Sequence, residues 1–138
     1  MGGYKGGEIA SSLAIKTAKN YIETNFAETE HTKEKLQELV KNAIEYANML
    51  VYEKSKEVPE LQGMGTTIEV ALVHNNRVYI GHVGDSRIYG YNHKEFTQFS
   101  YDQTFTNALL KAGYINDEQI NWFKKLYFYG LGELFYTN

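Results

Sequence analysis

The fold is decided by the stretch that begins with Gly63-Met64-Gly65-Thr66-Thr67 and ends with Val83-Gly84-Asp85-Ser86-Arg87-Ile88-Tyr89-Gly90. An apolar run and a turn lie between these two segments. Residues 66–73 are β-branched and apolar, which predicts a strand. The next four residues, His74-Asn75-Asn76-Arg77, predict a turn because Asn tolerates a positive φ. Residues 78–83 alternate with the period of two that a return strand requires. The stretch therefore predicts an antiparallel hairpin that ends in a Gly-Asp-Ser turn.

Asp85 is the candidate functional residue of that turn. Gly84 allows the backbone to bend sharply or to approach a ligand closely. A carboxylate followed by the hydroxyl of Ser86 and the guanidinium of Arg87 can hold a hard metal ion or orient a phosphate. The residue types alone favour a simpler interpretation, a polar turn in which Asp85 caps backbone N–H groups, because Asp and Ser are ordinary turn residues.

Two amphipathic helices are predicted before the hairpin. Apolar residues recur at helical spacing over residues 8–25 and again from the N-cap Thr32 to about Lys56, before Pro59. Lys35 stands at the third helical position, where a complete capping box has Glu or Gln. Each helix has one apolar face, so an antiparallel pair of them needs another surface to cover.

Short elements are predicted after the hairpin. Residues 87–91 and 95–100 read as two more strands, and a short helix begins at Asp102 or Thr104 and ends near Ala112. The predicted fold class is α+β, with an antiparallel β-meander packed against a pair of antiparallel helices. No internal repeat and no long linker divides the chain, which predicts a single domain over residues 1–138.

Composition and charge exclude several function classes. The 138 residues carry a net charge of −3 and include no cysteine, which excludes disulfides and thiol chemistry and fits a cytoplasmic protein. No apolar run is long enough to cross a membrane, and no basic stripe indicates nucleic acid. We therefore expect neither a membrane nor a nucleic acid as partner.

Other candidate catalytic groups form no recognisable set. No two histidines have ligand spacing on one element, so we interpret all four as ordinary surface or strand residues: His31, His74, His82 and His93. The candidate serines lack a His/Asp partner set, which argues against a serine hydrolase; they are Ser11, Ser12 and Ser86.

Taken together, several motifs resemble the PPM (PP2C-type) metal-dependent serine/threonine protein phosphatases, in their bacterial stand-alone form. The resemblance covers about residues 1–121 and leaves 122–138 as a divergent, aromatic tail, for which a frameshift within residues 124–128 is one hypothesis. Its motifs are Met1-Gly2-Gly3 with Gly6-Gly7-Glu8-Ile9-Ala10-Ser11, Gly63 to Thr67, Val83 to Tyr89, Phe99 to Thr104, and Leu110-Lys111-Ala112-Gly113. The family fold is a β-sandwich flanked by helix pairs, so the resemblance implies a partial PP2C-like sandwich.

The resemblance also implies a reaction. The family hydrolyses phosphoserine and phosphothreonine in proteins, and two Mg²⁺ or Mn²⁺ ions activate the attacking water. The expected partners are phosphoproteins and a cognate serine/threonine kinase.

Only part of the family's site is carried over. Gly2 and Gly3 match the end of the family motif Asp-Gly-Met-Gly-Gly, but the sequence begins at its Met, so the bridging aspartate is not present and no catalytic residue is predicted. Asp85 matches the aspartate of a third, peripheral metal ion, within the motif positions Gly84, Ser86 and Arg87. Asp102 matches another recurring position, which we interpret as structural.

These matches imply an internal fragment that lacks both ends of the family domain. We expect such a fragment to be inactive as it stands. The alternative from a different class is a non-catalytic PPM-like module that binds a phosphoprotein or another partner.

Overall fold

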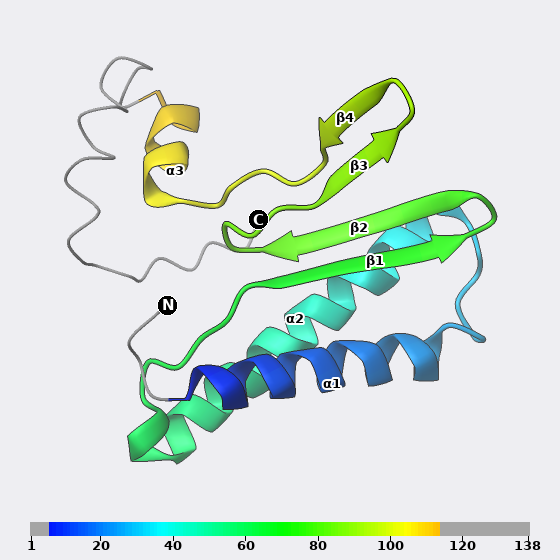
Figure 1. Cartoon of the computed structure of the whole chain (residues 1–138). Coiled ribbons are helices and arrows are strands. Elements are labelled where there is room, and N and C mark those ends of the chain that lie inside the picture. The colour runs from blue at the N-terminus through cyan, green and yellow to red at the C-terminus, as the bar shows by residue number, and fades with distance from the viewer. Residues whose placement is uncertain (1–5, 114–138) are drawn as a thin grey trace. The chain divides into compact units, whose positions relative to one another are not determined.

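The computed structural model describes residues 6–113, without the side chains of Phe105 and Thr106. The chain divides into two compact units, Met1–Tyr101 and Asp102–Asn138. The predicted tail at residues 122–138 lies outside the described residues. The elements follow one another in this order (Figure 1): α1 (Gly7–Asn25), α2 (Lys33–Glu57), the 3₁₀ turn η1 (Pro59–Leu61), β1 (Ile68–His74), β2 (Arg77–Val83), β3 (Tyr89–Asn92), β4 (Glu95–Gln98) and α3 (Phe105–Lys111).

Helices α1 and α2 form the predicted antiparallel pair and lie on one face of the β1–β2 hairpin (Figure 1). Small side chains occupy their contact. Ala10 and Ala14 of α1 are buried in one cluster with Ala43 and Ala47 of α2. Alanine leaves little side-chain bulk between two backbones, so the helices can pack closely at low entropic cost.

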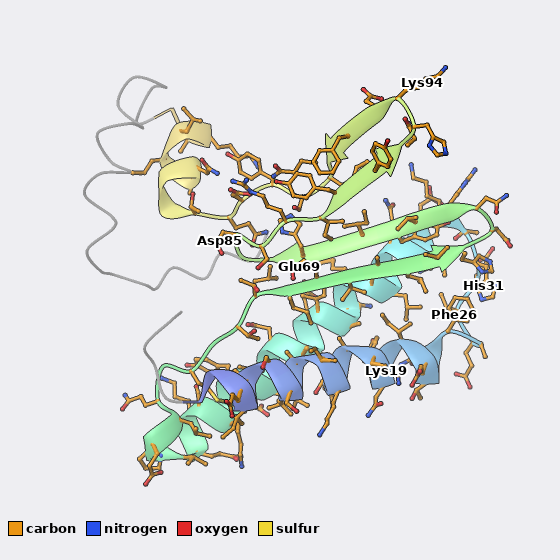
Figure 2. All side chains as sticks on the ribbon, viewed as in Figure 1. Lys19, Phe26, His31, Glu69, Asp85 and Lys94 are labelled. Carbon is orange, nitrogen blue, oxygen red and sulfur yellow. The ribbon has the colours of Figure 1, made fainter. Side chains whose placement is uncertain are left out.

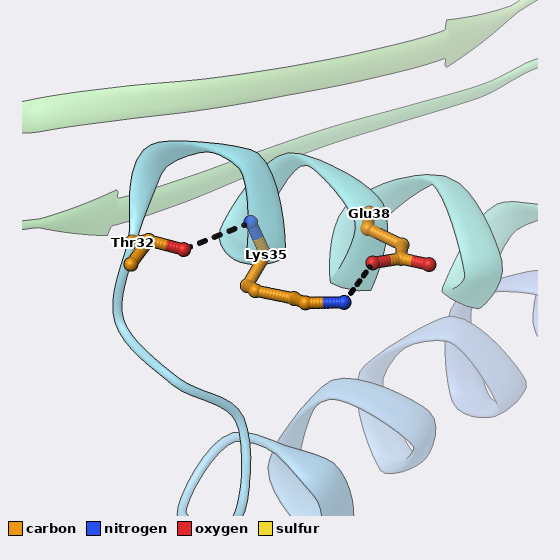
Figure 3. A network of polar contacts seen from close by, with 3 residues as sticks. All are labelled: Thr32, Lys35 and Glu38. Atoms are coloured by element: carbon orange, nitrogen blue, oxygen red, sulfur yellow. Dashed lines mark hydrogen bonds and ion pairs between the residues drawn. The ribbon is translucent and has the colours of Figure 1, made fainter.

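The N-terminus of α2 is capped as the sequence predicts. The hydroxyl of Thr32 accepts a hydrogen bond from the backbone N–H of Lys35 at 3.3 Å (Figure 3). The side chain of Lys35, where a capping box would have Glu, donates instead to Glu38 at 2.9 Å. This hydrogen bond raises the pKa of Lys35 and lowers the pKa of Glu38. The cap satisfies one of the backbone donors that a helix start leaves unpaired.

The predicted turn of the β1–β2 hairpin is present, but only two residues lie between the strands, because His74 and Arg77 belong to β1 and β2. Asn75 and Asn76 both have positive φ, 47° and 57°, as a type I′ turn requires. The strands pair from Ile68 opposite Val83 to His74 opposite Arg77. Strand β1 begins two residues later than the predicted start at Thr66.

The two faces of this hairpin differ. Val70, Leu72 and Tyr79 face the helices and join the buried clusters around α2. Gly81 lies on the same face, where an added Cβ would stand 2.7 Å from Ile44 Cδ1, so glycine lets β2 approach α2. The opposite face carries Glu69 and His82 at one end and is apolar and exposed near the turn, where Val73 and Val78 are 70% and 55% exposed.

The predicted α+β fold class with antiparallel strands is confirmed, but the strands do not form one meander. They form two separate two-stranded sheets, β1–β2 and β3–β4. The reason is local: Gly84 has a φ of 106°, which turns the chain away from β2. Beyond it, the N–H of Ile88 donates to the hydroxyl of Ser100 at 2.8 Å rather than to a strand. Strand β3 therefore begins at Tyr89, not at Arg87.

The described part of the second unit contains α3. Of the two predicted N-caps, Thr104 is the one used: its hydroxyl accepts from the N–H of Asn107 at 3.2 Å. Gly113 follows the helix with a φ of 76°, as the predicted C-terminal glycine. No helix among residues 6–113 is long and apolar enough to cross a membrane.

Candidate functional site at the Gly-Asp-Ser turn

The Gly-Asp-Ser turn is hydrogen-bonded to Thr67, the residue just before β1 begins. The hydroxyls of Thr67 and Ser86 lie 2.9 Å apart and share a hydrogen bond. Gly84 packs against the same threonine so closely that a Cβ would stand 2.5 Å from Thr67 Cγ2. The Gly65-Thr66-Thr67 and Gly84-Asp85-Ser86 motifs, separate in sequence, therefore meet at one end of the hairpin.

Asp85 projects from this turn as an exposed carboxylate. Within residues 6–113 its side chain accepts no hydrogen bond from a backbone N–H group, so the capping that the simpler interpretation assigns to it is not seen there. Arg87 Nη1 donates to the hydroxyl of Tyr89 at 3.3 Å. The turn thus presents the carboxylate to solvent on a backbone held by Gly84 and Ser86.

Glu69 is a second carboxylate at the same end of the hairpin (Figure 2). Burial raises the pKa of Glu69, nearby His82 lowers it when the imidazole is protonated, and the negative charge of Asp85 raises it further. Since like charges disfavour each other's ionised forms, a cation placed between Glu69 and Asp85 would relieve their repulsion.

His82 lies opposite Glu69 in the strand pairing. Its Nε2 accepts from the N–H of Tyr101 at 3.3 Å, which assigns the proton of a neutral ring to Nδ1. Nδ1 is enclosed and has no hydrogen-bond partner among the described residues. Sequence reasoning missed Glu69, although a two-residue turn at Asn75-Asn76 determines the register that pairs it with His82.

The described residues do not fit a metal ion by themselves. Residues 6–113 contain no group of three or more His, Cys, Asp or Glu side chains that could hold one. Asp85 and Glu69 offer carboxylate oxygens of the type that Mg²⁺ and Mn²⁺ prefer. A complete site therefore requires ligands from outside the described residues.

The other predicted positions are separated from the turn. Asp102 begins the second unit, where its backbone carbonyl accepts from Asn107 Nδ2 at 2.8 Å and from the N–H of Thr104 at 3.0 Å. Both bonds are made by its backbone just before α3, and the structural role of its side chain stays a prediction. Gly2 and Gly3 lie outside the described residues.

The fold brings two of the scattered histidines together. The rings of His31 and His74 have centroids 4.6 Å apart, and the ring of Phe26 stacks on His31. His31 Nε2 lies 3.0 Å from the carbonyl oxygen of Phe26, to which it donates. The cluster is at the turn end of β1, and no third ligand-type side chain completes a metal group in the part of the chain described.

Comparisons with known proteins show the family of this chain. The family model described as protein phosphatase 2C matches residues 1–115. The protein phosphatase PhpP of Streptococcus pneumoniae is 31% identical over 120 residues, which cover 86% of this chain and 47% of PhpP.

Two solved structures share the fold. The crystal structure of the serine/threonine phosphatase Stp1 from Staphylococcus aureus matches with a TM-score of 0.71 and 36% identity, over 86% of this chain and 46% of that chain. The Mycobacterium tuberculosis serine/threonine phosphatase PstP/Ppp matches with a TM-score of 0.67 and 32% identity, over 86% and 48%. The chain thus spans about half the length of these relatives, and it belongs to the protein phosphatase 2C family.

Proposed function

We propose that these residues are one part of a serine/threonine protein phosphatase that hydrolyses phosphoserine and phosphothreonine in proteins. Family membership and the similarity to the phosphatases PhpP, Stp1 and PstP/Ppp support this activity. The proposed partners are phosphoproteins and a cognate serine/threonine kinase, and the proposed location is the cytoplasm. In the whole enzyme, Mn²⁺ or Mg²⁺ supplies an activated water when bound.

The observation that best supports the proposal is the hydrogen bond between the Gly-Asp-Ser turn and Thr67. The bond between the Thr67 and Ser86 hydroxyls, 2.9 Å long, joins the two sequence motifs that are most characteristic of the family in this chain. In the proposed site Asp85 is a peripheral metal ligand, and Gly84, Ser86 and Arg87 shape the turn that presents it. Gly2, Gly3 and Asp102 are motif positions to which we assign no chemistry.

The 138-residue polypeptide alone should have little or no phosphatase activity. Asp85 is a single exposed carboxylate, and carboxylate sites for Mg²⁺ or Mn²⁺ need several oxygen ligands. Turnover of p-nitrophenyl phosphate with Mn²⁺, measured beside Stp1, tests this expectation. A turnover number comparable to that of Stp1 would contradict it.

A chimera tests the phosphatase assignment itself. Residues 1–121 of this chain would replace the matching segment of Stp1, which keeps the remaining Stp1 sequence. We expect a cooperatively folded chimera with Mn²⁺-dependent turnover, and a reduced response to Mn²⁺ when Asp85→Asn is added. Glu95→Gln, in exposed strand β4, is the matched carboxylate control. A chimera that melts cooperatively yet shows no turnover would overturn the assignment.

A further inference from the structure

An open groove lies between the start of α2 and the start of β2. It has a volume of about 410 Å³ and is lined by Lys33, Gln37, Arg77, Val78 and Tyr79. All five residues belong to the first unit, and the groove involves neither Asp85 nor its turn. A volume of this size falls in the range of sites that hold small ligands or side chains of a partner.

The positive charges of the groove are not neutralised. Lys33 and Arg77 form no ion pair within residues 6–113, whereas neighbouring Lys35 and Lys41 pair with Glu38 and Glu45. The acidic residues next to Lys33 in sequence, Glu30 and Glu34, bond to neither groove cation. An exposed Arg and Lys without partners favour an anion, and a guanidinium can bind two oxygens of a phosphate at once.

Tyr79 adds an accessible hydroxyl group to the groove. Its side chain is only 7% exposed, and its ring belongs to the buried cluster with Leu36 and Val40. No described residue forms a hydrogen bond with its hydroxyl. The Tyr79 hydroxyl is not among the enclosed side-chain atoms that lack a partner in the described chain, so solvent reaches it. It is therefore available as a donor to a ligand in the groove that Tyr79 lines.

Secondary-structure spacing brings the four polar residues of the groove together in two pairs. Arg77 and Tyr79 are two residues apart on β2, so they share one face of the strand. Lys33 and Gln37 are four residues apart on α2, so they share one face of the helix. Lys33 is the first residue of α2, where the positive end of the helix dipole adds to the attraction for an anion.

We propose that this groove binds a phosphate-type oxyanion carried on a protein segment, a phosphoserine or phosphothreonine side chain. Lys33 and Arg77 supply the charge, and the Tyr79 hydroxyl and the Gln37 amide supply further donors. The open shape admits a side chain with the peptide on either side of it. The anion site stands on the groove alone, whereas the phosphopeptide as its carrier rests on the proposed phosphatase function.

Titration of the full 138-residue chain by NMR tests the proposal, with EDTA present so that no metal takes part. The ligands are inorganic phosphate, a short phosphoserine peptide and the same peptide without phosphate. We expect saturable shifts of the Lys33, Gln37 and Arg77 to Tyr79 amides with both phosphorylated ligands, tighter for the peptide and weaker in high salt. If the phosphopeptide bound no more tightly than inorganic phosphate, a phosphorylated protein segment would be ruled out as the ligand of the groove.

Charge-neutral variants locate the binding. Arg77→Gln and Lys33→Gln should each weaken phosphopeptide binding about three- to tenfold, because each removes a charge-assisted bond. Tyr79→Phe keeps the ring in the core and should weaken binding about twofold to fivefold. The exposed lysines Lys19 on α1 and Lys94 between β3 and β4 (Figure 2) provide matched controls, Lys19→Gln and Lys94→Gln, with unchanged affinity.

Equal weakening by the groove variants and the lysine controls would overturn the site, since it would mean general surface attraction. Equal binding of the unphosphorylated peptide would overturn it as well. The NMR shifts of the groove amides do not depend on catalysis, so the two proposals can fail separately. If the groove binds phosphate but the Stp1 chimera is inactive, only the phosphatase function is contradicted. An active chimera whose groove amides do not shift counts against the groove alone.

Discussion

Gly84 determines the path of the backbone at the candidate site. Its φ is 106°, and a Cβ added to it would stand 2.5 Å from Thr67 Cγ2, so the site has no room for a side chain. Gly84→Ala should therefore lower the free energy of unfolding by about 2–4 kcal/mol, from the cost of a left-handed residue and of overpacking. Urea denaturation followed by circular dichroism measures this change.

The matched control for Gly84 is Gly7→Ala. Gly7 has no atom within 4 Å of an added Cβ, and it begins α1, where alanine has the higher helix propensity. The control should be neutral or stabilising by up to about 1 kcal/mol. Equal destabilisation by the two substitutions would show that the close contact with Thr67 is unimportant.

Glu69 should make stability depend on pH. Burial raises its pKa above the ordinary value of 4.5, so the folded state favours the protonated carboxyl. Its contribution is fully present below pH 4.5 and is lost as pH rises through the raised folded pKa. Glu69→Gln should therefore gain stability relative to the parent as pH rises through that window. Thermal melts from pH 3 to 7 check this, and a constant difference across the range would contradict it.

At the scale of elements, the cap of α2 is the contact most open to test. Thr32 accepts one hydrogen bond, from the N–H of Lys35. Thr32→Ala should cost about 0.5–2 kcal/mol of unfolding free energy, whereas Thr32→Asn should retain most of it because Asn also caps helices. Chemical denaturation of both variants measures the difference. Equal losses would mean that the threonine contributes by packing and not by capping.

At the scale of the whole molecule, the uncovered face of β1–β2 should limit solubility. Val73 and Val78 are directly paired across the strands and are 70% and 55% exposed. Exposed apolar strands with open edges promote association. Val73→Thr with Val78→Thr should raise the concentration at which the chain stays monodisperse, measured by light scattering, and should change the unfolding free energy by no more than about 0.5 kcal/mol.

Val70→Thr is the control from the opposite face of the same strand. Val70 packs against the helices, and placing a hydroxyl there should cost about 1–3 kcal/mol. Similar effects of the substitutions on both faces would contradict the one-sided core.

The amino-acid sequence by itself determined the local structure. The starts and ends of α1, α2 and α3, the Thr32 and Thr104 caps and the Asn75-Asn76 turn all depend on residues a few positions apart, whose propensities act directly on their own backbone. The sequence alone was also sufficient to recognise the family motifs, because Gly65-Thr66-Thr67 and Gly84-Asp85-Ser86 occur in a characteristic order. The strand register that pairs Glu69 with His82 also follows from the turn at Asn75-Asn76.

Only the tertiary structure decided how these pieces meet. A single positive φ at Gly84 ended the sheet that alternation alone would have continued, because periodicity carries no information on where a chain leaves a sheet. The bond between Thr67 and Ser86, the charge of Asp85 acting on Glu69, and the groove beside Tyr79 join residues that are distant in sequence. Such contacts arise from the packing of the hairpin on its helices, and for that reason no local pattern encodes them.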